Sequence, residues 1–218
     1  MSTDYERRSV SLVPGAVVKP FARAALLAAL TGATALFSIP IPISPAPLTL
    51  QVLFVFLAGL YLGPIWGPTA MALYLAAGAA GAPVFAGGSA GFGALVGDTA
   101  GFLWSYPIAA FVIGAIVHGR AGIGRRGIDP EATGIDRPGF FERSQVRNPA
   151  EVGTVRLVVA LVIATVIIYA MGATYGMWLL ALSPTEALAL YVAPFLIGEL
   201  IKMVAAVAVV RSEIVDPT

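Results

Sequence analysis

Long apolar runs, interrupted by glycine, proline and charged residues, follow one another along this chain of 218 residues. A helix needs about 20 apolar residues to cross a bilayer, and most of the runs approach that length. The pattern predicts six transmembrane helices, at residues 20–38, 48–62, 65–82, 97–118, 154–173 and 187–210. We therefore expect an all-α integral membrane protein in which six helices form one compact bundle.

Only Gly63 and Pro64 separate the second predicted helix from the third. Because glycine and proline favour turns, and because the run at 48–62 is short for a full crossing, we expect a tight helical hairpin whose turn lies near one membrane interface. The alternative is a single long broken helix over both runs, which would give five crossings.

The basic residues predict the orientation of the bundle. Of the 13 Lys and Arg residues, all except Lys202 lie before or at the start of the first helix, in or beside the connection 119–153, or after the last helix. On the opposite side, no Lys or Arg occurs in the connections 39–47, 83–96 and 174–186. Since basic loops stay in the cytoplasm, both termini are expected there. The predicted parts are a cytoplasmic segment at 1–19, a transmembrane domain at 20–210 and a cytoplasmic tail at 211–218.

The connection 119–153 is rich in Gly, Pro and charges of both signs. This composition is typical of a solvated, partly disordered cytoplasmic loop. Docking of an acidic partner or of lipid head groups to its basic residues is the alternative.

Near the start of the sequence, Arg7, Arg8 and Lys19 resemble the basic region of a secretory signal. The apolar run that follows is long for a signal and has no convincing cleavage site, so we interpret it as a retained span.

Composition agrees with a membrane protein, since 58% of the residues are hydrophobic, 11% are charged and the mean hydropathy is +0.88. A soluble core is excluded. The absence of cysteine excludes disulfides and thiolate metal sites, and the single histidine, His118, argues against a histidine metal centre. We interpret His118 as a residue of the membrane interface rather than a catalytic base. No nucleophile and base pattern and no ATP-binding motif is present, so we expect neither an enzyme nor a cofactor or nucleic-acid partner.

Glu199 and Lys202 are the charged pair of the last predicted helix, three residues apart and therefore on one helix face. A charge at mid-bilayer costs roughly 2.5–3.5 kcal/mol on insertion scales, so it persists where it faces the bundle interior and has a partner or a ligand. The pair indicates a binding site. A buried structural ion pair is the alternative.

Two connections predicted to face outward are apolar and rich in backbone breakers. The segment 39–47 holds four prolines, and the segment 83–101 is rich in glycine. Irregular backbone is tolerated at membrane depth where protein buries it or where it lines a cavity, so we expect these segments to cap an outward-opening pocket. The predicted apolar walls are Phe85, Phe92, Trp104, Tyr106 and Tyr191. A packed re-entrant loop without a ligand is the alternative.

Three further features of the sequence bear on contacts. Gln51, at the outer start of the second predicted helix, offers an amide to a ligand. Asp98 and Thr99 are expected to cap the fourth helix. On the first helix, four alanines form two small-xxx-small spacings that favour the close approach of another helix, at Ala24, Ala25, Ala28 and Ala29. The spacing alone does not decide whether that helix belongs to this chain or to a partner.

Five separated motifs carry a family resemblance: IPISPAPLTLQ at 41–51, LAGLYLGP at 57–64, GAPVFAGGSAG at 81–91, GDTAGF at 97–102 and GELIK at 198–202. Together they closely resemble the BioY family, the biotin-binding S components of energy-coupling factor (ECF) transporters. The likeness covers about residues 20–118 and 187–210 in matching order. Several motifs that agree in order are more specific than any one of them.

The resemblance implies high-affinity capture of biotin near the outer face of the cytoplasmic membrane and its delivery inward. It also implies partners, a transmembrane coupling subunit and two cytoplasmic ATPase subunits, although some members are thought to act without them. By position, Lys202 and Glu199 match the charges that contact the vitamin, the turn at 87–89 matches the lid, and the alanine stripe matches the surface that meets the coupling subunit. The ligand-binding residues expected here are Lys202, Glu199, Gly87, Gly88, Ser89, Phe92, Gln51, Thr99 and Tyr191.

Two departures from the family pattern affect the details of ligand contact. The family commonly has aspartate where this chain has Glu199, and a GPTGGY type of turn where this chain reads GDTAGF. The connection 119–153 is also longer than the usual inner connection. Two other functions stay open beside biotin uptake by an ECF transporter, namely an S component for another small vitamin and a biotin transporter that acts without the ATPase subunits.

Overall fold

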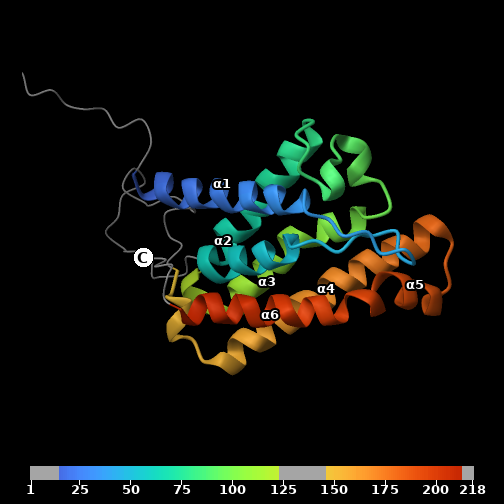
Figure 1. Cartoon of the computed structure of the whole chain (residues 1–218). Coiled ribbons are helices and arrows are strands. Elements are labelled where there is room, and N and C mark those ends of the chain that lie inside the picture. Colours follow the sequence, from blue (N-terminus) through green and yellow to red (C-terminus); the bar gives the residue numbers. More distant parts are fainter. Residues whose placement is uncertain (1–14, 123–145, 213–218) are drawn as a thin grey trace, which may run out of the picture.

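The computed structural model describes residues 15–122 and 146–212, and this part of the chain is almost entirely helical (Figure 1). Most of the predicted cytoplasmic segment 1–19, most of the loop 119–153 and the end of the tail lie outside the described residues. The helices are α1 (Gly15–Ala35), α2 (Gln51–Ala79), α3 (Ala100–Gly122), α4 (Thr154–Leu180), α5 (Pro184–Tyr191) and α6 (Leu196–Arg211). Short 3₁₀ turns lie at Ala86–Gly88, Phe92–Leu95, Pro149–Glu151 and Ala193–Phe195.

Helices α2 and α3 occupy the centre of the bundle (Figure 1). α2 packs against α1 and α3, α4 packs against α3, and α6 lies against α2 and α4. The interior between them is filled by large side chains without solvent exposure, such as Phe56, Tyr74, Ile113 and Ile168. Exposed apolar side chains cover the outer faces of α1, α4 and α6. Such faces suit contact with lipid tails, which are as apolar as leucine.

Five stretches of the described helices are long and apolar enough to cross a membrane: Val17–Ala35, Gln51–Ala79, Ala100–Gly119, Thr154–Leu180 and Pro184–Arg211. The protein is therefore an all-helical, multi-pass membrane protein with five candidate spans in its described part. The second of these spans contains both of the helices that the sequence predicts at 48–62 and 65–82.

Gly63 reverses the chain in the middle of α2. Its φ of 74° and ψ of −170° lie outside the helical region, and positive φ is a conformation that glycine adopts at little cost. The backbone bends so sharply that a Cβ atom added to Gly67 would lie 2.9 Å from the carbonyl oxygen of Ala58. The turn therefore lies where the sequence predicts it, and it divides α2 into halves of about 18 Å and about 24 Å at 1.5 Å per residue.

The last predicted helix, 187–210, is broken in the structure into α5 and α6. α5 starts with a capping box in which the Ser183 hydroxyl accepts from the Glu186 N–H and the Ser183 N–H donates to the Glu186 carboxylate at 2.8 Å. A 3₁₀ turn that contains Pro194 then separates it from α6, because proline has no N–H to continue a helix. In contrast, α4 runs to Leu180, seven residues beyond the predicted end at 173.

His118 joins three segments at one end of the bundle. The sequence places it at the membrane interface, but the side chain has no solvent exposure. Its Nε2 lies 2.9 Å from the carbonyl oxygen of Leu60, and its Nδ1 accepts from the backbone N–H of Arg147 at 3.1 Å. A neutral imidazole with the proton on Nε2 satisfies both bonds. His118 therefore holds the Gly63 turn, α3 and the start of the next described segment together.

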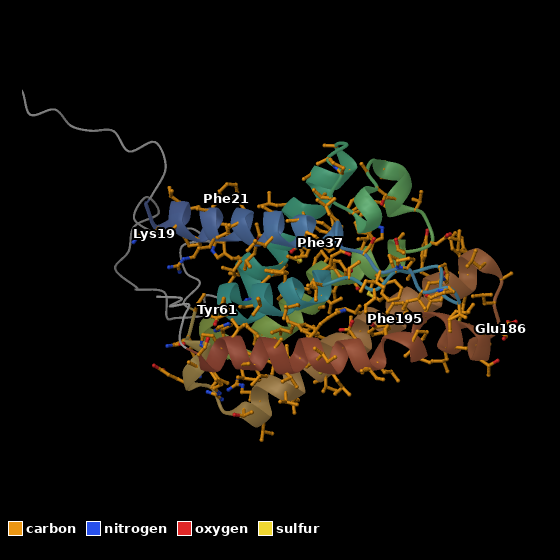
Figure 2. All side chains as sticks on the ribbon, viewed as in Figure 1. Lys19, Phe21, Phe37, Tyr61, Glu186 and Phe195 are labelled. Carbon is orange, nitrogen blue, oxygen red and sulfur yellow. The ribbon has the colours of Figure 1, made fainter. Side chains whose placement is uncertain are left out.

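Basic side chains gather at this same end of the bundle. Figure 2 shows Lys19 at one end of the molecule and Glu186 at the other. Arg156 donates to the carbonyl oxygen of Ile116 at 2.5 Å, and the Arg211 guanidinium donates to the carbonyl oxygen of Val152 at 2.8 Å. The described chain thus has a basic end and, opposite it, an end formed by the connections 36–50, 80–99 and 181–183.

The Gly63 turn leads to a stability prediction, because α3 packs against it through Gly114. A Cβ atom added to Gly114 would lie 2.4 Å from the backbone of Gly63 and Pro64, so Gly114→Ala forces the two helices apart. We expect a loss of stability of about 1–3 kcal/mol. The measurement is the midpoint of thermal unfolding in detergent, with Gly93→Ala as the control because nothing lies within 4 Å of the added atom there. Equal midpoints for the two variants would contradict this packing.

Candidate functional site

A cavity lies in the interior between α2, α3, α4 and α6, and the extended segment before α2 closes one side of it. It encloses about 470 Å³ of empty space, its opening included. The lining residues are Ala46, Pro47, Thr49, Gln51, Val52, Ala86, Thr99, Phe102, Leu103, Tyr106, Tyr169, Phe195, Glu199 and Lys202.

Glu199 and Lys202 form an ion pair on the cavity wall contributed by α6. The Lys202 ammonium lies 2.6 Å from Oε1 of Glu199, and the two residues are 5% and 2% exposed. The Tyr169 hydroxyl of α4 donates to the same Oε1 at 2.9 Å. The other carboxylate oxygen, Oε2, is buried and has no hydrogen-bond partner within the described part of the chain. A buried acceptor that carries negative charge is therefore left without a hydrogen-bond partner among the described residues.

A second polar group stands on the α2 side of the cavity. Gln51 is 2% exposed, its Oε1 accepts from the Thr49 hydroxyl at 2.9 Å, and its Nε2 donates to the Tyr74 hydroxyl. These bonds fix the amide plane of Gln51 before any ligand binds. Such fixed polar groups in an otherwise apolar pocket are what orient a small molecule.

Aromatic rings form the apolar part of the wall. Phe102 meets Tyr169 edge to face with ring centroids 5.7 Å apart, and Tyr169 lies 6.2 Å from Phe195. Behind the wall, Tyr191 stacks on Phe102 at 5.9 Å. Interlocked rings of this kind hold one another in place.

The structure brings together four of the predicted ligand-binding residues, since Lys202, Glu199, Gln51 and Thr99 all line the cavity. Tyr191 is fully buried behind the wall, and Phe92 is 66% exposed and is not part of the lining. Of the other predicted wall residues, Tyr106 lines the cavity, whereas Phe85 packs against Tyr74 and Trp104 is half exposed.

The predicted lid residues Gly87, Gly88 and Ser89 lie next to the cavity rather than in its lining. Their turn begins with Ala86, which does line the cavity, and it rests against the end of α1 near Leu36 and Ser38. Gly87 and Gly88 both have positive φ, of 68° and 78°. The turn is thus placed over one side of the site.

Sequence reasoning found Tyr106 but missed three other aromatic residues of the wall, namely Phe102, Tyr169 and Phe195. Phe195 precedes Glu199 by four residues, and this spacing is the signal that would have put it on the same face. Phe102 is the last residue of the GDTAGF motif, whereas Tyr169 lies inside a long apolar run and carries no comparable signal. The alanine stripe divides between two faces, because Ala24 and Ala28 are buried inside the bundle whereas Ala25 and Ala29 are exposed.

Comparisons with known proteins identify the family. A sequence model described as the BioY family matches residues 6–215, nearly the whole chain. The chain belongs to the BioY family. The resemblance seen in the five sequence motifs is thereby confirmed.

Two relatives in the family are similar over part of their length. The chain is 43% identical over 90 residues to the probable biotin transporter BioY of Pyrococcus horikoshii. These 90 residues make up 41% of this chain and 54% of the relative. It is 41% identical over 78 residues to the biotin transporter BioY of Thermotoga maritima, 36% of this chain and 46% of the relative. The chain spans about half the length of the curated relatives it matches.

A solved structure shares the fold. The chain resembles the structure titled "Crystal structure at 2.1 A of the S-component for biotin from an ECF-type ABC transporter" with a TM-score of 0.71. The match covers 89% of this chain and 90% of that chain at 22% sequence identity. At this identity, the likeness concerns the arrangement of the helices.

The ion pair gives a prediction for stability. Lys202→Met leaves Glu199 buried without its cation, and breaking a buried pair in this way costs about 3–5 kcal/mol. The double variant Glu199→Gln and Lys202→Met leaves no unpaired charge, so we expect it to recover much of the loss in thermal unfolding experiments. A double variant as unstable as Lys202→Met would show that the charge balance of the pair is not what matters.

Proposed function

We propose that this protein captures biotin from the outer side of the cytoplasmic membrane with high affinity, as the substrate-binding component of an uptake system. The observation that carries the proposal is the buried pair of Glu199 and Lys202 in the lining of a cavity, with one carboxylate oxygen left without a hydrogen-bond partner, in a chain of the BioY family. The names of the relatives, which are biotin transporters, support this choice of ligand.

The chemistry of biotin fits the lining of the cavity. Its ureido ring carries two N–H donors and a carbonyl acceptor, and its thiophane ring and alkyl chain are apolar. We propose that an N–H of the ureido ring donates to Oε2 of Glu199, and that the sulfur-containing ring and chain lie against Phe102, Tyr169 and Phe195. Gln51 is placed to contact the polar edge of the ring from the α2 side.

The charges favour the ureido ring, rather than the carboxylate of biotin, as the group next to the pair. Lys202 is already neutralised by Oε1 of Glu199 at 2.6 Å. An incoming carboxylate would also lie beside the anionic Oε2, and like charges repel strongly in a water-poor cavity. A neutral donor gains a charge-assisted hydrogen bond in the same place without that repulsion.

We further propose six crossings with both termini in the cytoplasm. The chain reversal at Gly63 lets each half of α2 enter the membrane from the basic end, and that end carries Lys19, Arg156 and Arg211. Basic residues favour the cytoplasmic side. The cavity lies toward the opposite end, where the connections 39–47 and 83–99 cover it, so biotin would enter from outside.

Energy for uptake would come from partners, an ECF transmembrane coupling subunit and two ATPase subunits. The exposed Ala25 and Ala29 of α1 provide a flat surface for a coupling helix, since small residues let two helices approach closely. Uptake of biotin without the ATPase subunits, and capture of a different small vitamin in the same cavity, are the two other functions that the site would serve.

Binding of biotin to the purified protein tests the proposal. Glu199→Gln removes the negative charge from Oε2, and a hydrogen bond to a charged group is worth about 1.5–3 kcal/mol, so we expect the dissociation constant to rise at least tenfold. Lys202→Ala should abolish high-affinity binding and uptake while the protein stays in the membrane. The matched control is Glu186→Gln, the same change on the exposed carboxylate of α5. Lack of binding by a well-folded wild type would contradict the function, and screening of other vitamins would follow.

The partner surface has its own test. Ala25→Leu with Ala29→Leu should prevent co-purification with the coupling subunit while biotin binding is retained, because the larger side chains hold the partner helix away. Ala170→Leu, on an exposed face of α4, is the control. Unchanged co-purification of the double variant would assign the contact to another surface.

A further inference from the structure

The Phe102 ring of the cavity wall rests on the backbone of Gly172 in α4. Helices α3 and α4 pack against each other (Figure 1), and Phe102 reaches from the one to the other. A Cβ atom added to Gly172 would lie 2.4 Å from Cζ, 2.5 Å from Cε1 and 2.6 Å from Cε2 of Phe102. The tip of the ring therefore occupies the space that any side chain at position 172 would need.

The same arrangement recurs one helical turn later, behind the wall. A Cβ atom added to Gly176 would lie 2.5 Å from Cε2 of Tyr191. Tyr191 is fully buried and stacks on Phe102, with 5.9 Å between the ring centroids and 28° between the ring planes. Its hydroxyl donates to the carbonyl oxygen of Asp98 at 3.4 Å. Two glycines four residues apart thus seat two stacked rings, of which Phe102 lines the cavity and Tyr191 does not.

These contacts leave the Phe102 ring one direction in which to move. Gly172 lies at its tip, Tyr191 stacks on it, and Tyr169 meets it edge to face at 5.7 Å. Because protein interiors are close-packed, the ring does not move into these neighbours, and the remaining side is the cavity. Ordinary contact begins at 3.4 Å, whereas the ring atom lies 2.4 Å from the added Cβ. An alanine at position 172 would therefore displace the ring toward the cavity.

From this geometry, and resting on the proposed binding of biotin, we propose that Gly172 is a positioning residue that determines which ring systems the cavity accepts. Because it has no side chain, it sets the Phe102 ring back and leaves room for the second, sulfur-containing ring of a fused bicyclic ligand. Gly172 itself is not part of the lining and acts through Phe102. The ureido ring, which the proposed function places at Glu199, does not depend on this room.

Binding of biotin to the purified protein, measured below the unfolding temperature of each variant, tests this inference. Gly172→Ala should raise the dissociation constant about tenfold or more, because the displaced ring takes up space that the ligand needs. In the background of Phe102→Leu, which removes the ring, the same change should alter the constant by less than about threefold. Gly176→Ala presses Tyr191 against Phe102, should act in the same direction, and replaces Gly172→Ala if that variant does not fold.

A ligand without the second ring gives an independent readout. Dethiobiotin keeps the ureido ring and the carboxylated chain of biotin but lacks the sulfur atom that closes the second ring. Gly172→Ala should therefore weaken dethiobiotin by less than about threefold, so that the ratio of the dethiobiotin constant to the biotin constant falls. A loss of stability alone would not change this ratio. If the wild type binds dethiobiotin too weakly to measure, the comparison in Phe102→Leu decides alone.

The control is Gly114→Ala, whose added Cβ atom is equally close to its neighbours, at 2.4 Å, but lies beside the Gly63 turn and outside the cavity lining. It should lower stability and leave both dissociation constants at their wild-type values.

Three results would overturn the inference and leave the proposed function standing. The first is biotin binding by Gly172→Ala within about threefold of wild type. The second is equal weakening of biotin with and without the Phe102 ring, and the third is equal weakening of biotin and dethiobiotin. Failure of the folded wild type to bind biotin would instead overturn the proposed function, and this inference with it.

Discussion

The free energy needed to bury two charges in a bilayer is the constraint on which this structure depends. Moving a carboxylate or an ammonium group out of water costs several kcal/mol per ion, and their attraction offsets this only with good geometry and further hydrogen bonds. In this protein Lys202 and Tyr169 both bind one oxygen of Glu199, and the second oxygen is left without a partner among the described residues. The pair is therefore incompletely satisfied, which a ligand with a donor group would correct. We propose that this incomplete satisfaction marks a binding site rather than a purely structural ion pair.

The breaks in the helices follow from the need to build a cavity around that pair. Irregular backbone is tolerated at membrane depth only where protein buries it or where it lines a cavity. The extended segment before α2 brings Thr49 to the cavity, and the break between α5 and α6 brings Phe195 to it. The reversal at Gly63 is packed against Gly114 and tied by His118, so it belongs to the support of the bundle at the other end. The irregular positions thus serve either the site or the frame that holds it.

The sequence predicted the parts of the site that stand out against an apolar background. Glu199, Lys202 and Gln51 are polar residues in hydrophobic runs, and all three line the cavity. The helices themselves were also predictable, because the lipid environment demands long apolar runs. The turn at Gly63 followed from the glycine and proline at that point.

The remaining parts of the site depend on how helices rotate against one another, which no local pattern encodes. Tyr169 looks like an ordinary member of an apolar helix, and the GDTAGF motif that ends at Phe102 does not indicate that this ring faces the cavity. Phe92 and Tyr191 were expected to contact the ligand, yet the first is exposed and the second stacks behind the wall. The division of the alanine stripe between a buried and an exposed face has the same origin, because four neighbouring alanines look alike in sequence.

The central claim is that Oε2 of Glu199 is the acceptor that a bound ligand completes. The most direct test is an experimental structure of the protein with biotin at a resolution that places the ureido ring. The account predicts a ureido nitrogen within hydrogen-bond distance of Oε2, about 2.7–3.2 Å, with the carboxyl end pointing away from Lys202. Biotin bound with its carboxylate on Lys202, or bound outside this cavity, would contradict it.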